Sequence, residues 1–179
     1  SCTMPWTKPS RLSATKRYCV VFNGEIYNFK EIAADLSKRG HQFAGHSDTE
    51  VLLAAVEEWG LSVAVDKFIG MFAFALLDRE RSMLHLCRDR LGEKPLYYGW
   101  LGKALYFASE LKAIESVVVK QLLEIDYHGL TGYLKNGYIS APHSIYKNIY
   151  KLIPGTVLSI PVSAGFRSQE FSPAADTTA

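Results

Sequence analysis

Apolar residues in the first third of the chain recur every three or four positions, which is the period of helices that bury one face. The pattern predicts two helices, and each begins with capping-box spacing and ends at a glycine. The residues are Asn28 with Glu31 before Gly40, and Ser47 with Glu50 before Gly60. An apolar, β-rich run at 18–22 precedes them and ends at Asn23-Gly24, which favours a strand that stops at a turn.

From residue 70 the apolar period changes to two. Residues 70–77 are apolar on both faces, which predicts a strand that is covered on both sides. Further strands are expected at 83–87, 96–100, 104–108 and 156–160, with short helices capped by Ser109 and Asp126. This succession is typical of the α+β class, with antiparallel sheets covered by helices. We expect one domain at 18–160, between an irregular arm at 1–17 and a flexible tail at 161–179.

The charge and composition of the chain limit the classes of molecule that it is expected to bind. Lysine and arginine total 20 against 18 acidic residues, and a formal net charge of +2 provides no large field for nucleic acid or anionic lipid. The longest apolar run, at 71–77, is far shorter than the roughly 20 residues of a membrane-spanning helix. We therefore expect no nucleic acid, no membrane and a cytoplasmic location. The three cysteines and five histidines lack metal-site spacing, so no metal is expected.

The run at 22–28, Phe-Asn-Gly-Glu-Ile-Tyr-Asn, offers the most informative chemistry. Asn23 has an amide NH2 and Gly24 an unhindered backbone N–H, and these two donors can converge on a developing oxyanion. Glu25 beside them and Asp48 in the next helix are carboxylates that can grip the ammonium of an amino acid. Taken one at a time, the same residues are more typical of a turn and of an acidic first helical turn.

A second segment of interest, at 88–98, is rich in charged residues and lies in a loop between two predicted strands. One interpretation is a solvated loop with an Arg–Asp pair, which contributes little to stability. The other is a loop at a domain boundary that receives a partner domain. The residues concerned are Arg88, Asp89, Arg90 and Lys94.

Taken together, the segments 22–28, 47–50 and 70–98, with Phe-Ala-Ser-Glu at 107–110, resemble the class II glutamine amidotransferase domain of glutamine-hydrolysing asparagine synthetases. The resemblance implies a four-layer αββα N-terminal-nucleophile (Ntn) hydrolase sandwich of two antiparallel sheets. In that family the domain hydrolyses glutamine and supplies ammonia for the ATP-dependent amination of aspartate. The implied roles are an oxyanion hole for Asn23 and Gly24, substrate ammonium binding for Glu25 and Asp48, and proximity to the synthetase domain for Arg88, Asp89, Arg90 and Lys94.

The resemblance departs from the family pattern at both ends. The family's amino-terminal Cys-Gly-Ile strand and His-Arg-Gly-Pro-Asp segment have no counterpart before Tyr18, and no Ser-Gly-Gly-x-Asp-Ser loop appears. We expect a domain truncated at both ends, without its first strand, and inactive alone because the catalytic cysteine is missing. No cofactor is expected in this chain, since ATP and magnesium are implied only for the missing synthetase domain.

Two other hypotheses stay open. One is a non-catalytic interaction module that keeps the amidotransferase fold and docks on a synthetase-like partner. The other is an independent glutaminase that uses Cys2, which the flanking Ser1 and Thr3-Met4 and the short distance to Asn23 disfavour. A sandwich without its first strand exposes an edge, which also predicts a homodimer, an exchanged arm from residues 1–17 or a marginally stable fold.

Overall fold

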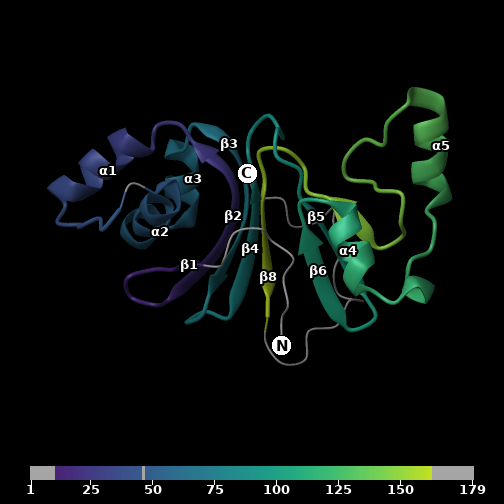
Figure 1. Cartoon of the computed structure of the whole chain (residues 1–179), viewed down its shortest axis with the longest axis horizontal. Helices are drawn as coiled ribbons and strands as arrows, with labels where there is room; N and C mark the ends of the chain where they lie inside the picture. Colours follow the sequence, from purple (N-terminus) through teal and green to yellow (C-terminus); the bar gives the residue numbers. More distant parts are fainter. Residues whose placement is uncertain (1–10, 46, 163–179) are drawn as a thin grey trace.

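The computed structural model describes residues 11–45 and 47–162, and it shows four layers in the order helices, sheet, sheet, helices (Figure 1). The elements in chain order are β1 (Arg11–Leu12), β2 (Tyr18–Ile26), α1 (Phe29–Lys38), α2 (Asp48–Trp59), α3 (Leu61–Lys67), β3 (Gly70–Asp78), β4 (Met83–Arg88), β5 (Tyr97–Leu101), β6 (Ala104–Ala108), α4 (Leu111–Val117), the 3-10 helix η1 (Lys120–Leu122), α5 (Tyr127–Asn136), β7 (Ile149–Lys151) and β8 (Val157–Pro161). The predicted α+β class and αββα arrangement are confirmed.

The larger sheet has the strand order β1-β2-β3-β4-β8, and its strand pairs are antiparallel. Its centre is the long ladder between β2 and β3, which runs from Tyr18 opposite Asp78 to Ile26 opposite Gly70. Alternate residues of these strands form one core with α1, α2 and α3, and Phe74 and Leu52 are fully buried in it. This half carries its own hydrophobic core, on the left of Figure 1.

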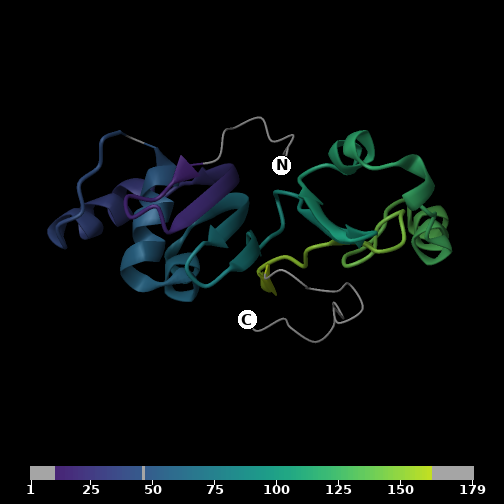
Figure 2. The same cartoon turned by 90° about the horizontal axis from the view of Figure 1, so that it is seen from below.

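The smaller sheet has the order β6-β5-β7, and it packs face to face with the larger sheet. Small residues of β3, Ala73 and Ala75, meet Leu96 and Leu152 in the core between the sheets. The outer face of the smaller sheet is covered by α4, whose Ile114 is 2% exposed. Figure 2 shows the two halves side by side, with β5 to β7, α4 and α5 in the second.

The predicted end of the first strand at Asn23-Gly24 is wrong, because β2 continues to Ile26. Gly24 has a φ of +141°, and a Cβ at this position would lie 2.1 Å from the carbonyl oxygen of Met71. The glycine is therefore required by the close approach of β3, and not by a turn.

The predicted helices α1 and α2 exist, but their capping boxes do not form. Asn28 and Ser47 occupy the N-cap positions without a side-chain cap hydrogen bond. Instead, the Asn28 amide donates to the carbonyl of Lys67 over 2.9 Å, and its Oδ1 accepts from the N–H of Ile69 over 3.0 Å. This residue ties the start of α1 to the segment between α3 and β3.

Two later cap predictions have opposite outcomes. Asp126 caps α5 as predicted, because its side chain accepts from the N–H of His128, and Gly137 ends the helix in the left-handed region. Ser109 does not cap α4. The N-cap of that helix is Glu110, which has no side-chain cap hydrogen bond, while Ser109 bonds elsewhere.

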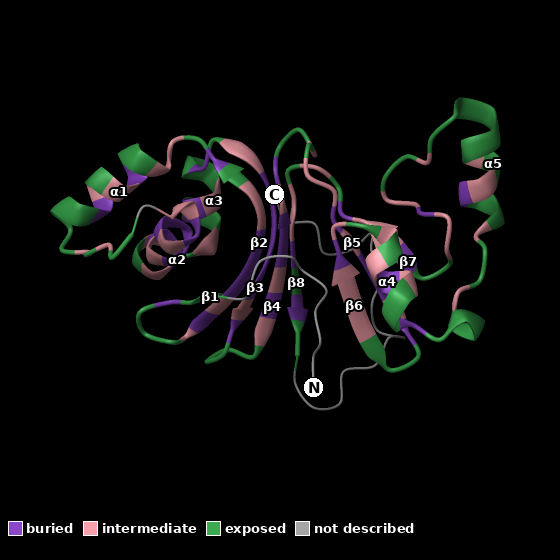
Figure 3. Ribbon diagram, in the orientation of Figure 1, coloured by how far each residue is buried: buried purple, intermediate pink, exposed green. Residues whose placement is uncertain are grey.

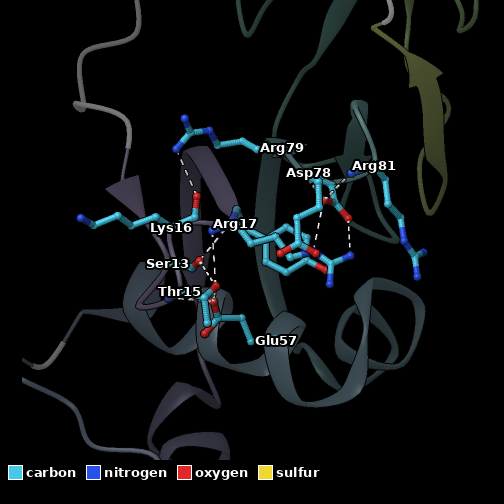
Figure 4. Close-up of polar contacts among 10 residues, drawn as sticks. Ser13, Thr15, Lys16, Arg17, Glu57, Asp78, Arg79 and Arg81 are labelled. Atoms are coloured by element: carbon cyan, nitrogen blue, oxygen red, sulfur yellow. Dashed lines mark hydrogen bonds and ion pairs between the residues drawn. The ribbon is translucent and has the colours of Figure 1, made fainter.

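The segment predicted to be an irregular arm contains β1, which pairs with the first residues of β2. Next to this pairing, the Arg17 guanidinium donates to both carboxylate oxygens of Asp78, which is 2% exposed (Figure 4). Thr15 bonds to Glu57 of α2 in the same cluster. Residues 1–10 and 163–179, and with them most of the predicted arm and tail, lie outside the described residues.

The exposure of α5 is unusual for a helix of this composition. Tyr127 is 73% and Leu134 77% exposed, and Gly129 is the buried residue of this helix (Figure 3). A Cβ on Gly129 would lie 2.2 Å from the carbonyl oxygen of Ser144, so α5 packs inward through a glycine and turns apolar side chains outward. No helix within residues 11–45 and 47–162 is long and apolar enough to cross a membrane.

Candidate functional site

Three of the predicted glutamine-site residues are consecutive at the carboxyl end of β2. Asn23 pairs with Ala73 of β3, which belongs to the core between the sheets. Side chains alternate along a strand, so Asn23 and Glu25 both point to this inter-sheet side, about 7 Å apart along β2. Asn23 is half-buried and Glu25 is exposed. The inter-sheet space therefore opens to solvent at this end of the strand.

Asp48, the fourth predicted residue, reaches the same end of β2 from the start of α2. Its Oδ2 accepts from the backbone N–H of Ile26 over 3.4 Å, and its Oδ1 accepts from the N–H of Thr49 over 2.8 Å. The helix amino terminus also favours a carboxylate at this position. The fold thus brings Asp48 beside the residue that follows Glu25, although the two carboxylates are 23 positions apart in sequence.

The segment that leads into α2 is held by that helix itself. The Glu50 carboxylate accepts from the backbone N–H groups of Ala44 and Gly45, over 2.9 and 3.2 Å. These bonds take the place of the predicted capping box. They fold the preceding segment against the first turn of the helix, which carries Asp48.

Glu25 and Asp48 have no positively charged partner in the part of the chain that the structure describes, because neither residue takes part in an ion pair there. Carboxylates without a cationic partner attract a positively charged group. A charge-assisted hydrogen bond from an ammonium group to each carboxylate suits this arrangement.

The backbone N–H of Gly24 points to the free edge of β2. Successive N–H groups of a strand point to opposite edges. Tyr27 donates toward the β3 side, whereas Ile26 donates to Asp48 on the other side. Gly24 lies two residues before Ile26, so its N–H shares the Asp48 edge. Strand β1 pairs only with the start of β2, so no described strand reaches Gly24 on this side.

Ser109 is a contact of the site that sequence reasoning missed. The Asn23 Nδ2 donates to the Ser109 Oγ over 2.9 Å, across 86 positions of the chain. Ser109 had been expected to cap α4, and no local pattern pointed to β2. The contact joins the Asn23 side chain to the turn between β6 and α4, which belongs to the other sheet.

The charged loop at 88–94 begins at the same end of the larger sheet. The N–H of Asp89 donates to the carbonyl of Phe72 over 2.8 Å, and Phe72 pairs with Gly24. Neighbouring strands lie about 4.8 Å apart, so the loop begins about 10 Å from β2. A partner that contacts this loop would therefore be close to the predicted glutamine site.

Asp89 organises the loop from inside, because it is only 1% exposed. Its Oδ1 accepts from the N–H groups of Leu91 and Glu93 over 3.1 and 3.0 Å, and its Oδ2 accepts from Lys94 over 3.0 Å. The Asp89 side chain forms no ion pair among the described residues. The predicted Arg–Asp pair of a solvated loop is therefore not formed.

The two arginines of the loop donate to backbone carbonyls. The acceptors are Lys94, Leu152 and Gly92 for Arg88, and Phe68 and Asp66 for Arg90. Burial lowers the pKa of Arg88 from its ordinary value, although the nearby Asp89 opposes this shift. Three of the four residues predicted to meet a partner domain thus hold the loop together. Their role at an interface stays a prediction.

Neither described cysteine is suited to attack a substrate at Asn23. Cys19 lies on the same strand, four residues away, which corresponds to about 13 Å. Cys87 is fully buried, and burial raises the pKa of its thiol far above the ordinary value. Cys2 lies outside the described residues. Within residues 11–45 and 47–162, no cluster of three or more His, Cys, Asp or Glu residues could hold a metal ion.

A cavity of about 250 Å³ lies away from the predicted glutamine site, on the helix-covered side of the larger sheet. Its walls come from β1, the segment 41–43 and α2. None of the four predicted glutamine-site residues lines it.

The fold and the candidate site at the end of β2 both agree with the protein family that this sequence matches. The glutamine amidotransferase domain family matches residues 8–171, and this chain belongs to that family. Among solved structures, the glutamine phosphoribosylpyrophosphate amidotransferase of Bacillus subtilis superposes with a TM-score of 0.59 at 20% identity. The match covers 86% of this chain and 29% of that one. The predicted Ntn hydrolase fold is therefore confirmed.

Similar sequences include several glutamine-hydrolyzing asparagine synthetases. Asparagine synthetase 1 of Bacillus subtilis is 37% identical over 143 residues, which are 80% of this chain and 22% of that protein. A putative asparagine synthetase 2 of Methanocaldococcus jannaschii is 39% identical over 134 residues, 74% of this chain and 25% of that protein. The chain thus spans about a quarter of the length of these relatives and matches only their glutamine-hydrolysing part.

Proposed function

We propose that this chain is the glutaminase half of a cytoplasmic asparagine synthetase, where it binds the glutamine whose amide becomes ammonia for the amination of aspartate. The observation that carries the proposal is the contact between Asp48 and the N–H of Ile26. This contact ties a second carboxylate, which has no ion-pair partner among the described residues, to the end of β2 that also carries Asn23, Gly24 and Glu25. The relatives, which are glutamine-hydrolyzing asparagine synthetases, support the choice of substrate.

In this arrangement Glu25 and Asp48 hold the α-ammonium of glutamine. The amide of Asn23 and the N–H of Gly24 then donate to the side-chain carbonyl oxygen, where negative charge develops during attack. ATP and magnesium belong to the synthetase portion of such an enzyme, and we propose no cofactor for this chain. Arg88, Asp89, Arg90 and Lys94 lie where that portion approaches the site.

Calorimetric titration with L-glutamine tests the binding site. We expect saturable binding that weakens about tenfold or more in Glu25→Gln and in Asp48→Asn, because each substitution removes one hydrogen bond between charged groups. Glu31→Gln is the matched control, since Glu31 is an exposed carboxylate in the first turn of α1. Equal affinities in all four proteins would refute the assigned site.

Ammonia release tests the catalytic part of the proposal. Neither Cys19 nor Cys87 can serve as nucleophile beside Asn23, so we expect the 179-residue chain alone to bind glutamine without turnover. Any ammonia release would contradict this expectation, and release that persists in Cys2→Ala would also exclude Cys2 as the nucleophile. Release that is lost in Cys2→Ala would instead support an independent glutaminase that uses Cys2.

A docking role is the second candidate function, and the exposed apolar face of α5 favours it. We propose that Tyr127 and Leu134 contact the part of an asparagine synthetase that lies outside the matched region, which is about three quarters of the relatives' length. A homodimer through the same face is the competing arrangement, and sedimentation of the isolated chain would reveal it.

Co-purification with that part of the Bacillus subtilis relative tests the docking surface. Leu134→Asp should reduce the recovered complex at least tenfold, because it places a charge in the centre of an apolar contact. Val63→Asp is the matched control, since Val63 is 48% exposed and belongs to α3, which lies on the other side of the two sheets from α5 (Figure 1). Equal recovery of the two variants would exclude α5 as the docking surface.

A further inference from the structure

Ser109 contacts the predicted glutamine site from the second sheet, through the hydrogen bond from Asn23 Nδ2 to its Oγ. We propose that Ser109 is a positioning residue, which orients the Asn23 amide so that its second N–H points at the side-chain carbonyl of bound glutamine. This inference rests on the proposed function, because it assumes that Asn23 is an oxyanion donor.

Both ends of this hydrogen bond are attached to rigid parts of the molecule. Ser109 follows Ala108, which is 3% exposed, and precedes α4, whose Ile114 is anchored in the core under that helix. Asn23 lies inside the ladder with β3, opposite the fully buried Ala73. The backbones on both sides are therefore held in place. Rotation of the Asn23 side chain is the remaining freedom, and the bond to Ser109 restricts it.

The restricted rotation of the Asn23 amide decides whether its NH2 or its oxygen faces the substrate. The asparagine NH2 carries two hydrogens, and its oxygen only accepts. The torsion that turns the amide group is broad and roughly two-fold, so an unrestrained amide can present either end to a substrate. When Ser109 accepts one hydrogen, the NH2 is fixed on this side and the second hydrogen stays available. A donor oriented in advance needs no reorganisation when charge develops on the substrate.

A purely structural role for the bond makes a different prediction. The two sheets are already joined by an apolar core in which Ala73 and Ala75 face Leu96 and Leu152. If Ser109 served only to join the sheets, its loss would lower thermal stability and leave glutamine affinity unchanged. If it positions Asn23, its loss changes the behaviour of one amide group and the affinity for glutamine, with little effect on melting.

Nuclear magnetic resonance of the Asn23 side-chain amide distinguishes the two roles. In Ser109→Ala we expect Nδ2 hydrogen exchange to rise at least tenfold and glutamine affinity to fall about fivefold, which is the effect of one lost hydrogen bond. Ser109→Thr retains the hydroxyl, so it should keep both properties within about twofold of the unmodified chain. Melting temperatures should differ by less than about 3 °C among these proteins.

Asn23→Asp is the matched control for the donor. A carboxylate at this position can accept a hydrogen bond from Ser109 but cannot donate to glutamine. This variant should therefore keep the contact between the sheets and bind glutamine more weakly than Ser109→Ala does. If Ser109→Ala does not fold, Ser109→Cys replaces it, because a thiol is similar in shape but a much weaker acceptor.

Unchanged Nδ2 exchange in Ser109→Ala would overturn the proposal, as would a Thr variant that behaves like the Ala variant. Lower melting temperature with unchanged glutamine affinity would also overturn it and support the purely structural role. If the unmodified chain does not bind glutamine, the proposed function fails separately. The Nδ2 exchange alone then decides whether Ser109 fixes Asn23.

Discussion

The two halves of the sandwich bury their helices to very different extents. In α2, which covers the larger sheet, six of 12 residues are buried, whereas α5 beside the smaller sheet buries one of ten. The apolar residues of α2 point inward at Leu52 and Val56, and those of α5 point outward at Tyr127 and Leu134. The helices of the first half are packed against its sheet, and α5 in the second half presents apolar surface that suits a partner.

The candidate site residues are also divided unequally between the two halves. Asn23, Gly24, Glu25 and Asp48 all belong to the well-buried half, on β2 and at the start of α2. A site on such a frame keeps its geometry without help from a partner. The second half contributes one side chain, Ser109, through a single hydrogen bond. We therefore expect substitutions in the first half to affect the stability of the chain and its affinity for glutamine strongly. Substitutions at exposed positions of the second half should affect association with a partner protein.

The largest contrast is expected between two glycine substitutions. Gly24→Ala should cost at least about 4 kcal/mol or prevent folding, because its Cβ would meet the Met71 carbonyl oxygen at 2.1 Å. Gly132→Ala in α5 should stabilise the chain by about 0.5–1 kcal/mol, since nothing lies within 4 Å of its Cβ and alanine favours a helix. Urea unfolding measures both, and a tolerated Gly24→Ala would contradict the described β2–β3 contact.

The loop that follows β4 should be nearly as sensitive. Asp89→Ala leaves the N–H groups of Leu91, Glu93 and Lys94 without their acceptor, and we expect a loss of about 3 kcal/mol. Asp89→Asn should cost about half as much, because its oxygen still accepts two of these bonds while its NH2 faces the Lys94 N–H. Urea unfolding should rank the variants in this order. Equal stability of Asp89→Ala and the unmodified chain would rule out an organising role.

Acid should weaken the larger sheet through Asp78. The hydrogen bond from Arg17 lowers the pKa of Asp78 below its ordinary value, against the opposing effect of burial. The ionised form is thus favoured in the folded state, so this contribution is present above about pH 4 and is lost as pH falls through the lowered pKa. Asp78→Asn should cost about 1–3 kcal/mol at pH 7 and show a flatter loss of stability below pH 4. Parallel acid curves for both proteins would contradict this linkage.

The smallest effect is expected on the exposed face of α5. Leu134→Ala should change the free energy of unfolding by less than about 0.5 kcal/mol, because the side chain is 77% exposed. Leu52→Ala in α2 is the comparison within the packed half and should cost about 2–5 kcal/mol, since Leu52 is fully buried. A destabilisation of similar size at both positions would show that the two halves are packed alike.

Much of the architecture was predictable because it depends on local periodicity. The helical spacing of α1 and α2 and the alternation of β3 are visible in the sequence, and the structure confirms these elements. Strand β7 was missed because its three residues are too few to show a period, and helix α3 was missed as well. The joint occurrence of several motifs, and not any one residue, indicated the family.

The errors at individual residues share a physical cause, which is a partner far away in the sequence. Gly24 is a glycine because of Met71, and Asn28 bonds to Lys67 and Ile69. Ser109 turns to Asn23 in place of its own helix. Capping and turn preferences describe local alternatives only, so they cannot anticipate such contacts. The contact between Asp48 and β2 is also long-range, and no local pattern predicted it, although the chemistry of two carboxylates and the family resemblance both linked Asp48 to Glu25.

In the proposed function, Glu25 and Asp48 bind the same ammonium group. The most direct test compares the affinity for L-glutamine with that for glutaric acid monoamide, which is glutamine without its α-amino group. The unmodified chain should bind glutamine at least about tenfold more tightly, because glutaric acid monoamide cannot form the charged hydrogen bonds to the two carboxylates. The Glu25→Gln/Asp48→Asn double variant should bind the two ligands almost equally. An unmodified chain that binds both ligands equally, or a double variant that still prefers glutamine, would contradict the claim.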